Sequence, residues 1–302
     1  MSRSFSQYDA APIEHEVDEE FAFWKRETRC YLLKDVTSSV TFAAHELERI
    51  DFMWGRIRSD RTVSSSAVDA TVRVEGHLVV FANVKPKLTK AQRNAPRSST
   101  LQQYCVLDQI LELHGIVQSQ MEKLVALEKF LGAQHQDLME DQPSNEDVEV
   151  HVAIVQRTFQ CLGRICQELR NAANVLRLPS RRRFPFCSHI DHTFKPPLPS
   201  EVIVDFSIHR GELLVEVFSL MATQKSITTI PEGCASGKEF VGCVCAFRGQ
   251  KVEIVEYARV SVPIPPLEEM LVHLDKQILW LVHVRDNVKA LLDCQDMYNE
   301  EY

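Results

Sequence analysis

The chain has 302 residues, of which 45% are hydrophobic and 25% charged, close to the average for globular proteins and enough to bury a core without disulfides or metals. Its net charge of −8, from 42 acidic and 34 basic residues, disfavours a general nucleic-acid binder, which needs a basic footprint. No stretch reaches the roughly 18 to 20 apolar residues of a membrane span, and the amino-terminal segment lacks the apolar core of a signal peptide. We therefore expect a cytosolic protein whose cysteines are reduced.

The first part of the chain predicts a helix followed by a β-hairpin. Apolar residues at a 4-3 spacing predict a helix over residues 18–54, which ends before Gly55. Residues 55–67 are polar, rich in Ser and Arg, and without periodicity, so we expect a connector. Over residues 68–84 apolar and polar residues alternate, which predicts a hairpin that turns at Glu75-Gly76.

Two long helices are predicted in the middle of the chain. Apolar residues recur every seven positions over residues 99–131, and a polar, acidic connector follows over residues 132–147. The next helix carries an uninterrupted 4-3 ladder: Val148, Val152, Val155, Phe159, Leu162, Cys166, Leu169, Ala173 and Leu176. Such a ladder is typical of a helix that packs against other helices along one stripe.

The last part of the chain predicts strands and a final helix. Residues 179–200 contain five prolines, which rule out a continuing helix and favour an extended crossing segment. Alternating apolar residues then predict two more hairpins, turning at Arg210-Gly211 and Arg248-Gly249. After a proline-rich stop, a 4-3 seam predicts a helix over residues 267–299.

Helices at both ends and in the middle of the chain predict an α+β fold. We expect an elongated, coiled-coil-like antiparallel four-helix bundle with a discontinuous antiparallel β-hairpin domain of six strands. The helical bundle domain would comprise residues 14–56, 99–178 and 266–299, and the β domain residues 57–98 and 179–265. Because a 4-3 seam serves packing within and between chains alike, it leaves the oligomeric state open.

The sequence contains no common catalytic signature. It lacks a GxxxxGK[ST] phosphate loop, a GxSxG nucleophile elbow and an HExxH helix, so we predict no catalytic residue, no cofactor and no enzymatic activity.

One short stretch has the residue types of a metal site. Cys187, His189 and His192 would supply a thiolate and two imidazoles to zinc, and Cys234 is a conceivable fourth ligand. Their spacing matches no common zinc pattern. The alternative is a polar loop in which the histidines bond backbone or water.

Two basic clusters lie in predicted connectors: Lys85, Lys87, Lys90, Arg93 and Arg97 in the first, and Arg181, Arg182 and Arg183 in the second. On an acidic protein such clusters could receive an acidic partner, an anionic lipid headgroup or a nucleic acid. The alternative is that they are solvated loops.

The order and spacing of the apolar patterns resemble the Rogdi family. The resemblance is strongest from Phe194 to Leu220, where Pro197-Leu198-Pro199 precedes a hairpin with that family's alternating pattern. Further similarity covers most of the chain: residues 18–24, 76–87, 148–178 and 251–292. The chain departs from the family in the extension before Val17, in residues 132–147 and in the Cys/His-rich stretch 187–192.

Membership of the Rogdi family would imply a non-catalytic adaptor. Rogdi proteins resemble a small subunit of the RAVE complex, which works with rabconnectin-3/DMX-like proteins and promotes assembly of the V1 sector of the V-ATPase onto its membrane sector. The resemblance thus implies these partners, no nucleic acid, and a cytoplasmic protein recruited through partners to endosomal, lysosomal or synaptic-vesicle membranes, while also allowing a nuclear pool.

Overall fold

The computed structural model describes residues 22–88, 98–134, 145–180, 182–187, 190, 192–228, 230 and 237–299. The chain forms two compact units. Unit 1 comprises Met1–Glu46, Gln120–Glu168 and Lys276–Tyr302, and unit 2 comprises Leu47–Ser119 and Leu169–Asp275.

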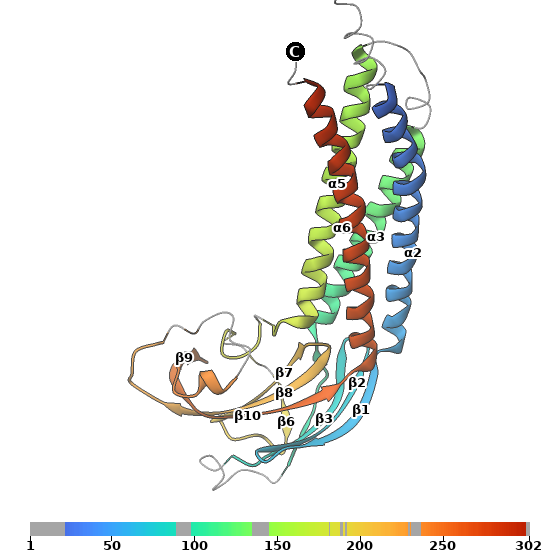
Figure 1. The fold of residues 1–302 in the computed structure, drawn as a ribbon. Helices are drawn as coiled ribbons and strands as arrows, with labels where there is room; N and C mark the ends of the chain where they lie inside the picture. The colour runs from blue at the N-terminus through green and yellow to red at the C-terminus, as the bar shows by residue number, and fades with distance from the viewer. Residues whose placement is uncertain are drawn as a thin grey trace, which may run out of the picture. The chain divides into compact units, whose positions relative to one another are not determined.

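Four α-helices dominate the described part of the chain: α2 (Thr37–Phe52), α3 (Asp108–Ala133), α5 (Asn145–Arg177) and α6 (Pro265–Asn299) (Figure 1). Residues 22–30 are also helical and continue into α2 through the π-helical turn η1 (Tyr31–Val36); the 3-10 turn η2 (Met53–Arg56) follows α2. The helices predicted over residues 148–176 and 267–299 are confirmed. Within the described residues, no helix is both long and apolar enough to span a membrane.

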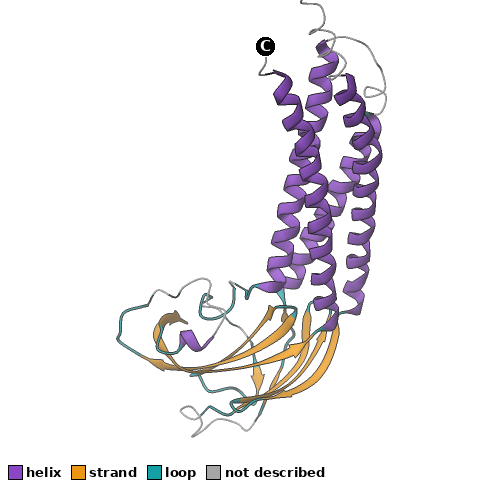
Figure 2. Cartoon of the chain, in the orientation of Figure 1, coloured by secondary structure: helices purple, strands orange, loops and turns teal. Residues whose placement is uncertain are grey.

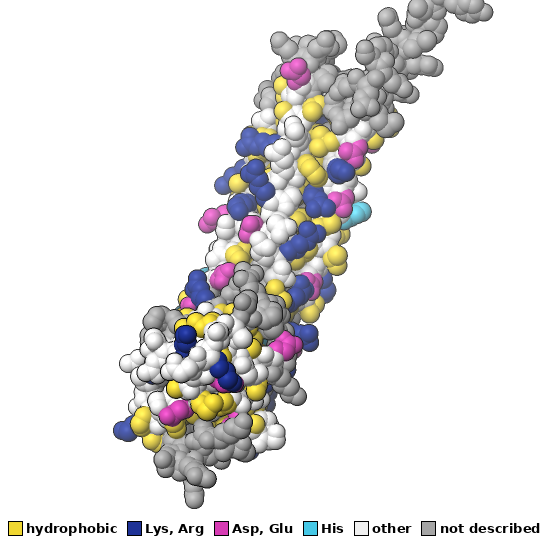
Figure 3. Space-filling model, turned by 90° about the vertical axis from the view of Figure 1, so that its left-hand side faces the viewer, with side chains coloured by type: hydrophobic (Ala, Val, Ile, Leu, Met, Phe, Trp, Pro, Cys, Tyr) yellow, Lys and Arg dark blue, Asp and Glu magenta, His cyan; other side chains and the backbone are white. Residues whose placement is uncertain are grey.

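Unit 1 is built from stretches of these helices that lie far apart in the sequence. Trp24 donates its indole N–H to the Leu291 carbonyl at 2.8 Å, and Thr41 donates to Glu128 at 2.7 Å. On the helices seen in Figure 3, hydrophobic side chains are interspersed with charged side chains of both signs. That face therefore carries no broad field of one sign.

Among the described residues of unit 2, ten strands form two antiparallel sheets. The strands are drawn in orange in Figure 2. Sheet A contains β1 (Arg58–Ser64), β2 (Val68–Glu75), β3 (Leu78–Pro86), β4 (Ser99–Leu101), β5 (Cys105–Val106) and β6 (Phe194–Lys195). They lie in the order β1-β2-β3-β4-β6, and β5 also pairs with β3. Sheet B contains β7 (Val202–His209), β8 (Glu212–Ala222), β9 (Val244–Phe247) and β10 (Gln250–Pro263), in the order β7-β8-β10-β9. The 3-10 turn η3 (Gly237–Phe240) precedes β9.

The three predicted hairpins are confirmed as β2-β3, β7-β8 and β9-β10. Both Arg-Gly turns hold two successive positive φ angles, 55° and 77° at Arg210-Gly211 and 48° and 78° at Arg248-Gly249. This is the backbone of a type I′ turn, whose twist matches that of the flanking strands.

A β-bulge alters the predicted alternation in β3. Val68, Ala70, Val72 and Val74 are buried on β2 as expected. Between Arg73 and Val74, however, the partner residue jumps from Phe81 to Val79, so β3 holds one extra residue. Val79 is therefore buried where the simple alternation predicted Leu78 and Val80.

The predicted fold class is wrong in its architecture. The protein is α+β, with four helices and ten strands in two antiparallel sheets among its described residues, and not an elongated four-helix bundle with one domain of hairpins. The 4-3 ladders identified the apolar faces of the helices but not what covers them. One end of each helix belongs to unit 2, together with both sheets. The predicted domain boundaries follow element type, whereas the compact units cut through the helices.

Two segments predicted as connector or helix are strands. Residues 58–64 form β1, and residues 99–101 and 105–106 form β4 and β5, so α3 begins only at Asp108. β1 is mostly exposed and therefore shows no apolar alternation. Its extended form depends on pairing with β2 along its whole length.

Candidate functional site

A buried ion pair lies on sheet B. The Arg183 guanidinium donates from Nη1 to both carboxylate oxygens of Glu216 at 3.0 Å, and both side chains are almost fully buried. Glu216 also accepts from the Tyr257 hydroxyl at 2.8 Å and from the Ser207 hydroxyl at 3.4 Å. Burial, with the Glu216 charge beside it, raises the pKa of Tyr257, so this hydroxyl stays protonated and donates. The buried carboxylate thus has three donors.

Asp205 holds the segment that carries Arg183. On β7, Asp205 lies directly opposite Glu216 of β8. Its Oδ2 accepts the backbone N–H of Phe184 at 2.7 Å, and its Oδ1 accepts the N–H of Phe206 at 2.8 Å. Two adjacent residues of the crossing segment are therefore bound to two carboxylates of one hairpin.

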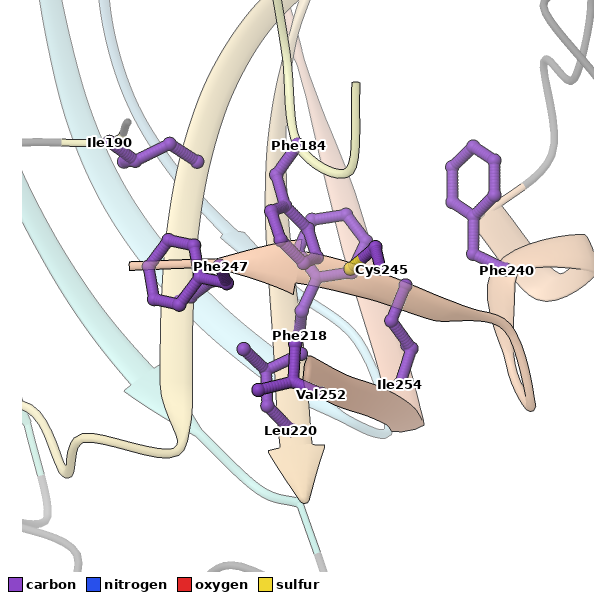
Figure 4. Close-up of a cluster of buried hydrophobic side chains, with 10 residues drawn as sticks. Phe184, Ile190, Phe218, Leu220, Phe240, Cys245, Phe247, Val252 and Ile254 are labelled. Carbon is purple, nitrogen blue, oxygen red and sulfur yellow. The ribbon is translucent and has the colours of Figure 1, made fainter. Parts of the chain in front are cut away.

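The side chain of Phe184 enters the hydrophobic core of sheet B. Figure 4 shows it among Phe218, Phe247, Cys245 and other buried side chains of this cluster. Its ring lies 4.9 Å from that of Phe218 and 5.7 Å from that of Phe247, in edge-on contacts. The Arg183 guanidinium lies 5.4 Å from the centre of the Phe240 ring. Apolar packing and the ion pair together fix the crossing segment on the sheet.

A thiol, an imidazole and a carboxylate meet beside this network. His192 Nε2 lies 3.7 Å from Cys105 Sγ and 3.6 Å from Asp205 Oδ1, next to a hollow of about 150 Å³. Both contacts fall on the same ring nitrogen, whereas a catalytic relay uses one nitrogen for each partner. Burial and the nearby Asp205 charge raise the pKa of Cys105 to about 12. The thiol is protonated at neutral pH and is a poor nucleophile.

Gln109 connects β7 to the end of α5. Its amide nitrogen donates to the carbonyls of Val175 at 2.8 Å, Leu178 at 3.2 Å and Ile208 at 2.9 Å. Its amide oxygen accepts the N–H of Ile208 at 2.7 Å. The NH2 group has two hydrogens, so two of these three carbonyls share one of them. One buried amide thus contacts two carbonyls at a helix terminus and both backbone groups of a strand residue.

The predicted zinc ligands are placed only in part. His189 and Cys234 lie outside the described residues, Cys187 is half-buried, and His192 contacts Cys105 and Asp205. Among the residues that the structure describes, no three His, Cys, Asp or Glu side chains are grouped to hold a metal ion.

The predicted basic clusters are also placed in part. Lys90, Arg93, Arg97 and Arg181 lie outside the described residues. Lys85 and Lys87 are exposed at the end of β3. Lys87 donates to Asp69 at 2.6 Å, and together with the Ser64 hydroxyl it holds the pKa of that carboxyl below its usual range.

The second basic cluster divides between surface and core. Arg182 is exposed and pairs with Asp108 at 3.0 Å. Arg183 was expected at a partner-binding surface, but it is buried against Glu216. A run of arginines does not show which one turns inward, and this one does so because a buried carboxylate needs a cation.

Sequence reasoning missed Asp205, Glu216, Gln109 and Tyr257. A signal for the first two was present: a hairpin that turns at Arg210-Gly211 places Asp205 opposite Glu216 within two otherwise apolar strands. Two buried carboxylates side by side require donors. The chain position of those donors could not be read from the pattern.

A comparison with protein families gives a match. The family model described as Rogdi leucine zipper containing protein matches residues 62–244, which is more than half of the chain. The matched part includes Gln109, Arg183, Asp205 and Glu216. A comparison with curated proteins gives no match. The chain therefore belongs to the Rogdi leucine zipper containing protein family.

Proposed function

We propose that this chain is a non-catalytic adaptor of a RAVE/rabconnectin-3-type complex, which promotes assembly of the V1 and Vo sectors of the V-ATPase and thereby acidification of organelles. The observation that carries the proposal is the family match over residues 62–244, because the sequence resemblance to Rogdi proteins implies this complex.

The chemistry of unit 2 supports an adaptor. The carboxylates of Glu216 and Asp205 accept hydrogen bonds from side chains and backbone of the protein itself. The Cys105 thiol is held protonated beside His192. These groups stabilise the fold, and their arrangement is not one that transfers protons or attacks a substrate. An adaptor needs a rigid surface more than a reactive group.

The proposed partners are a rabconnectin-3/DMX-like protein and V1 subunits. The chain would act in the cytoplasm and reach endosomal, lysosomal or synaptic-vesicle membranes through these partners. The experiment is affinity purification of the tagged chain, combined with measurement of organelle pH after its removal. We expect both partners in the purified complex and a rise in luminal pH that the intact chain reverses. Absence of both partners together with unchanged luminal pH would refute the proposal.

The exposed basic residues of sheet A are candidates for partner contact. Lys85→Glu reverses an exposed charge at the end of β3. The matched control is Lys289→Glu on α6, which reverses another exposed charge, in unit 1. We expect only Lys85→Glu to weaken co-purification. Equal effects of the two substitutions would show that net charge matters and this position does not.

A further inference from the structure

The outer edge of β1 carries backbone groups that point away from β2. Gly76 donates to the Ile57 carbonyl at 2.8 Å, and Ser65 donates to the Val68 carbonyl at 2.8 Å, so the odd-numbered residues of this strand bond to β2. In an antiparallel ladder the alternate residues direct their N–H and C=O groups to the other side. On β1 these residues are Arg58, Asp60, Thr62 and Ser64.

The two edge strands of sheet B, β7 and β9, have part of their outward-facing backbone bonded already. On β7, Gln109 bonds both backbone groups of Ile208, and Asp205 accepts the N–H of Phe206. On β9, Thr228 donates its N–H to the Val244 carbonyl and accepts the Val244 N–H through its hydroxyl.

The edge strand β6 has only two residues, which is itself a protection against pairing. β1 has seven residues, none of them proline, and among the described strands it pairs only with β2. β1 is therefore an edge at which another strand could add.

The side chain of Arg61 sets the charge that an added strand must carry. Ser59, Arg61 and Val63 share the inner face of β1, where Ser59 is buried and donates to the Pro263 carbonyl at 3.0 Å. Arg61 lies on this same face and is nevertheless exposed. An inward-facing charge at a sheet edge disfavours pairing with any strand that does not neutralise it.

A second copy of this chain does not neutralise Arg61. If two β1 strands paired antiparallel with all four outward-facing residues bonded, Arg58 would face Ser64, and Asp60 would face Thr62. Arg61 would then lie directly opposite the Arg61 of the second copy, in a non-hydrogen-bonded pair where side chains are closest. Like charges at such a position are destabilising, so the suitable occupant is a different strand with a carboxylate there.

We propose that β1 binds an extended acidic segment of a partner protein by strand addition. The backbone of that segment bonds to Arg58, Asp60, Thr62 and Ser64, and a carboxylate at its centre pairs with Arg61. Main-chain hydrogen bonds supply affinity, and the Arg61 pair supplies selectivity. The inference goes beyond the proposed function, because it concerns the chemistry of the segment and holds for any partner that carries it.

The test uses two peptides of the same length as β1, Thr-Val-Thr-Glu-Thr-Val-Thr and its match with Lys in place of Glu. Each is titrated to its solubility limit into the full-length, isotope-labelled chain while backbone amide signals are recorded. We expect the acidic peptide to shift the amide signals of Asp60, Thr62 and Ser64 and to slow their hydrogen exchange. We expect the lysine peptide to bind more weakly.

Two variants and one control locate the interaction. Arg61→Glu should weaken binding of the acidic peptide by about tenfold, because an attractive cross-strand pair becomes a repulsive one, and should favour the lysine peptide. Thr62→Pro removes an outward-facing N–H without breaking a backbone hydrogen bond to β2, although it does remove the 3.0 Å bond between the Thr62 and Thr71 hydroxyls. It should abolish binding of both peptides. Lys251→Glu makes the same charge change at an exposed position of β10 in sheet B and should leave binding unchanged.

Several results would overturn the proposal: no shift with either peptide, shifts confined to other strands, or equal binding of the two peptides. A dimer in sedimentation that Thr62→Pro dissociates would show that a second copy occupies the edge instead. If Thr62→Pro fails to fold, Arg61→Glu still tests the proposal, because this variant should bind the lysine peptide more tightly than the acidic one.

Discussion

The side chain of Gln109 takes the place of a neighbouring strand for Ile208, donating to its carbonyl at 2.9 Å and accepting its N–H at 2.7 Å. Because the amide has the same donor and acceptor pair as a peptide group, it ends the ladder of sheet B without leaving Ile208 unpaired. The same side chain binds two carbonyls at the end of α5.

Gln109→Ala should lower the free energy of unfolding by about 2 to 4 kcal/mol, because several buried backbone groups lose their partners. Chemical denaturation monitored by circular dichroism measures this change. The control is Gln102→Ala, which removes an exposed side chain with a single bond to the Thr100 carbonyl and should change stability by at most about 0.5 kcal/mol. Equal effects of the two substitutions would contradict this role of Gln109.

Replacing only one member of the Arg183–Glu216 pair should lower the stability of the fold strongly. Glu216→Gln removes the carboxylate charge that pairs with the buried Arg183 guanidinium and should reduce stability by about 3 to 5 kcal/mol. Asp108→Asn interrupts the exposed pair with Arg182 and should cost less than about 1 kcal/mol. The double change Arg183→Met with Glu216→Leu should recover much of the lost stability. If the double variant is as unstable as Glu216→Gln, the lost stability does not come from an uncompensated charge.

The two Arg-Gly turns offer a matched pair of glycine substitutions. Gly211 and Gly249 have φ angles of +77° and +78°, so alanine is strained by about 1 to 2 kcal/mol at either position. A Cβ at Gly211 would also lie 3.1 Å from the backbone nitrogen of Glu268, whereas a Cβ at Gly249 meets open space. Thermal unfolding should therefore show a larger loss for Gly211→Ala than for Gly249→Ala. The reverse order would mean that the approach of Glu268 does not constrain this turn.

The cysteines should differ widely in their rate of alkylation. Cys30 and Cys294 are exposed, whereas burial raises the pKa of Cys105 to about 12 and that of Cys245 to about 11. Since the thiolate is the reactive form, iodoacetamide should modify the exposed pair first and the buried pair only on unfolding. Mass spectrometry of timed digests gives the order. Early labelling of Cys105 in the folded protein would contradict the protonated, buried thiol.

His209 should make stability depend on pH. Burial, together with the charges of Arg210, Arg259 and Arg183, lowers its pKa below the ordinary value of 6.5. The folded state then binds fewer protons than the unfolded state, so stability falls as the pH falls through 6.5 toward the lower folded pKa. Measuring the unfolding of the wild type and of His209→Gln at about pH 7.5 and about pH 5.5 isolates the contribution of His209 to this pH dependence, since both proteins have the other histidines. The variant should lose less stability on acidification, and an equal loss would exclude His209 as a cause.

The predictable part of the fold was the part with a strong local pattern. Arg210-Gly211 and Arg248-Gly249 determine their hairpins because the Gly takes one of the two positive φ angles at small cost, so that only the Arg is strained. β1 was unpredictable because an exposed strand has no apolar alternation, and its conformation comes from its neighbour. The sequence also did not show that the hairpins belong to two different sheets. Alternation shows which face of a strand is buried, but it does not show which element covers that face.

The candidate site follows the same division. The turn between β7 and β8 already implies that Asp205 and Glu216 lie opposite each other. The contact of Arg183 with Glu216, in contrast, depends on the path of a proline-rich segment without periodicity, which the sequence does not predict. Gln109 is the second residue of α3. A glutamine at that position is common, and nothing in the sequence indicates which distant backbone groups it binds. Long-range polar contacts of this kind come from tertiary packing and leave no local signature.

The hydrogen bond from Trp24 to Leu291 joins residues 267 positions apart. Unit 1 draws its last stretch, residues 276–302, from a part of the chain that the ribosome makes after the other two stretches of this unit. During synthesis the apolar faces of the earlier helices therefore stay partly uncovered until α6 has been made. A nascent chain stopped within α6 would present those faces to chaperones and proteases, so a nonsense mutation within α6 would also remove the earlier helices of unit 1 from the folded population.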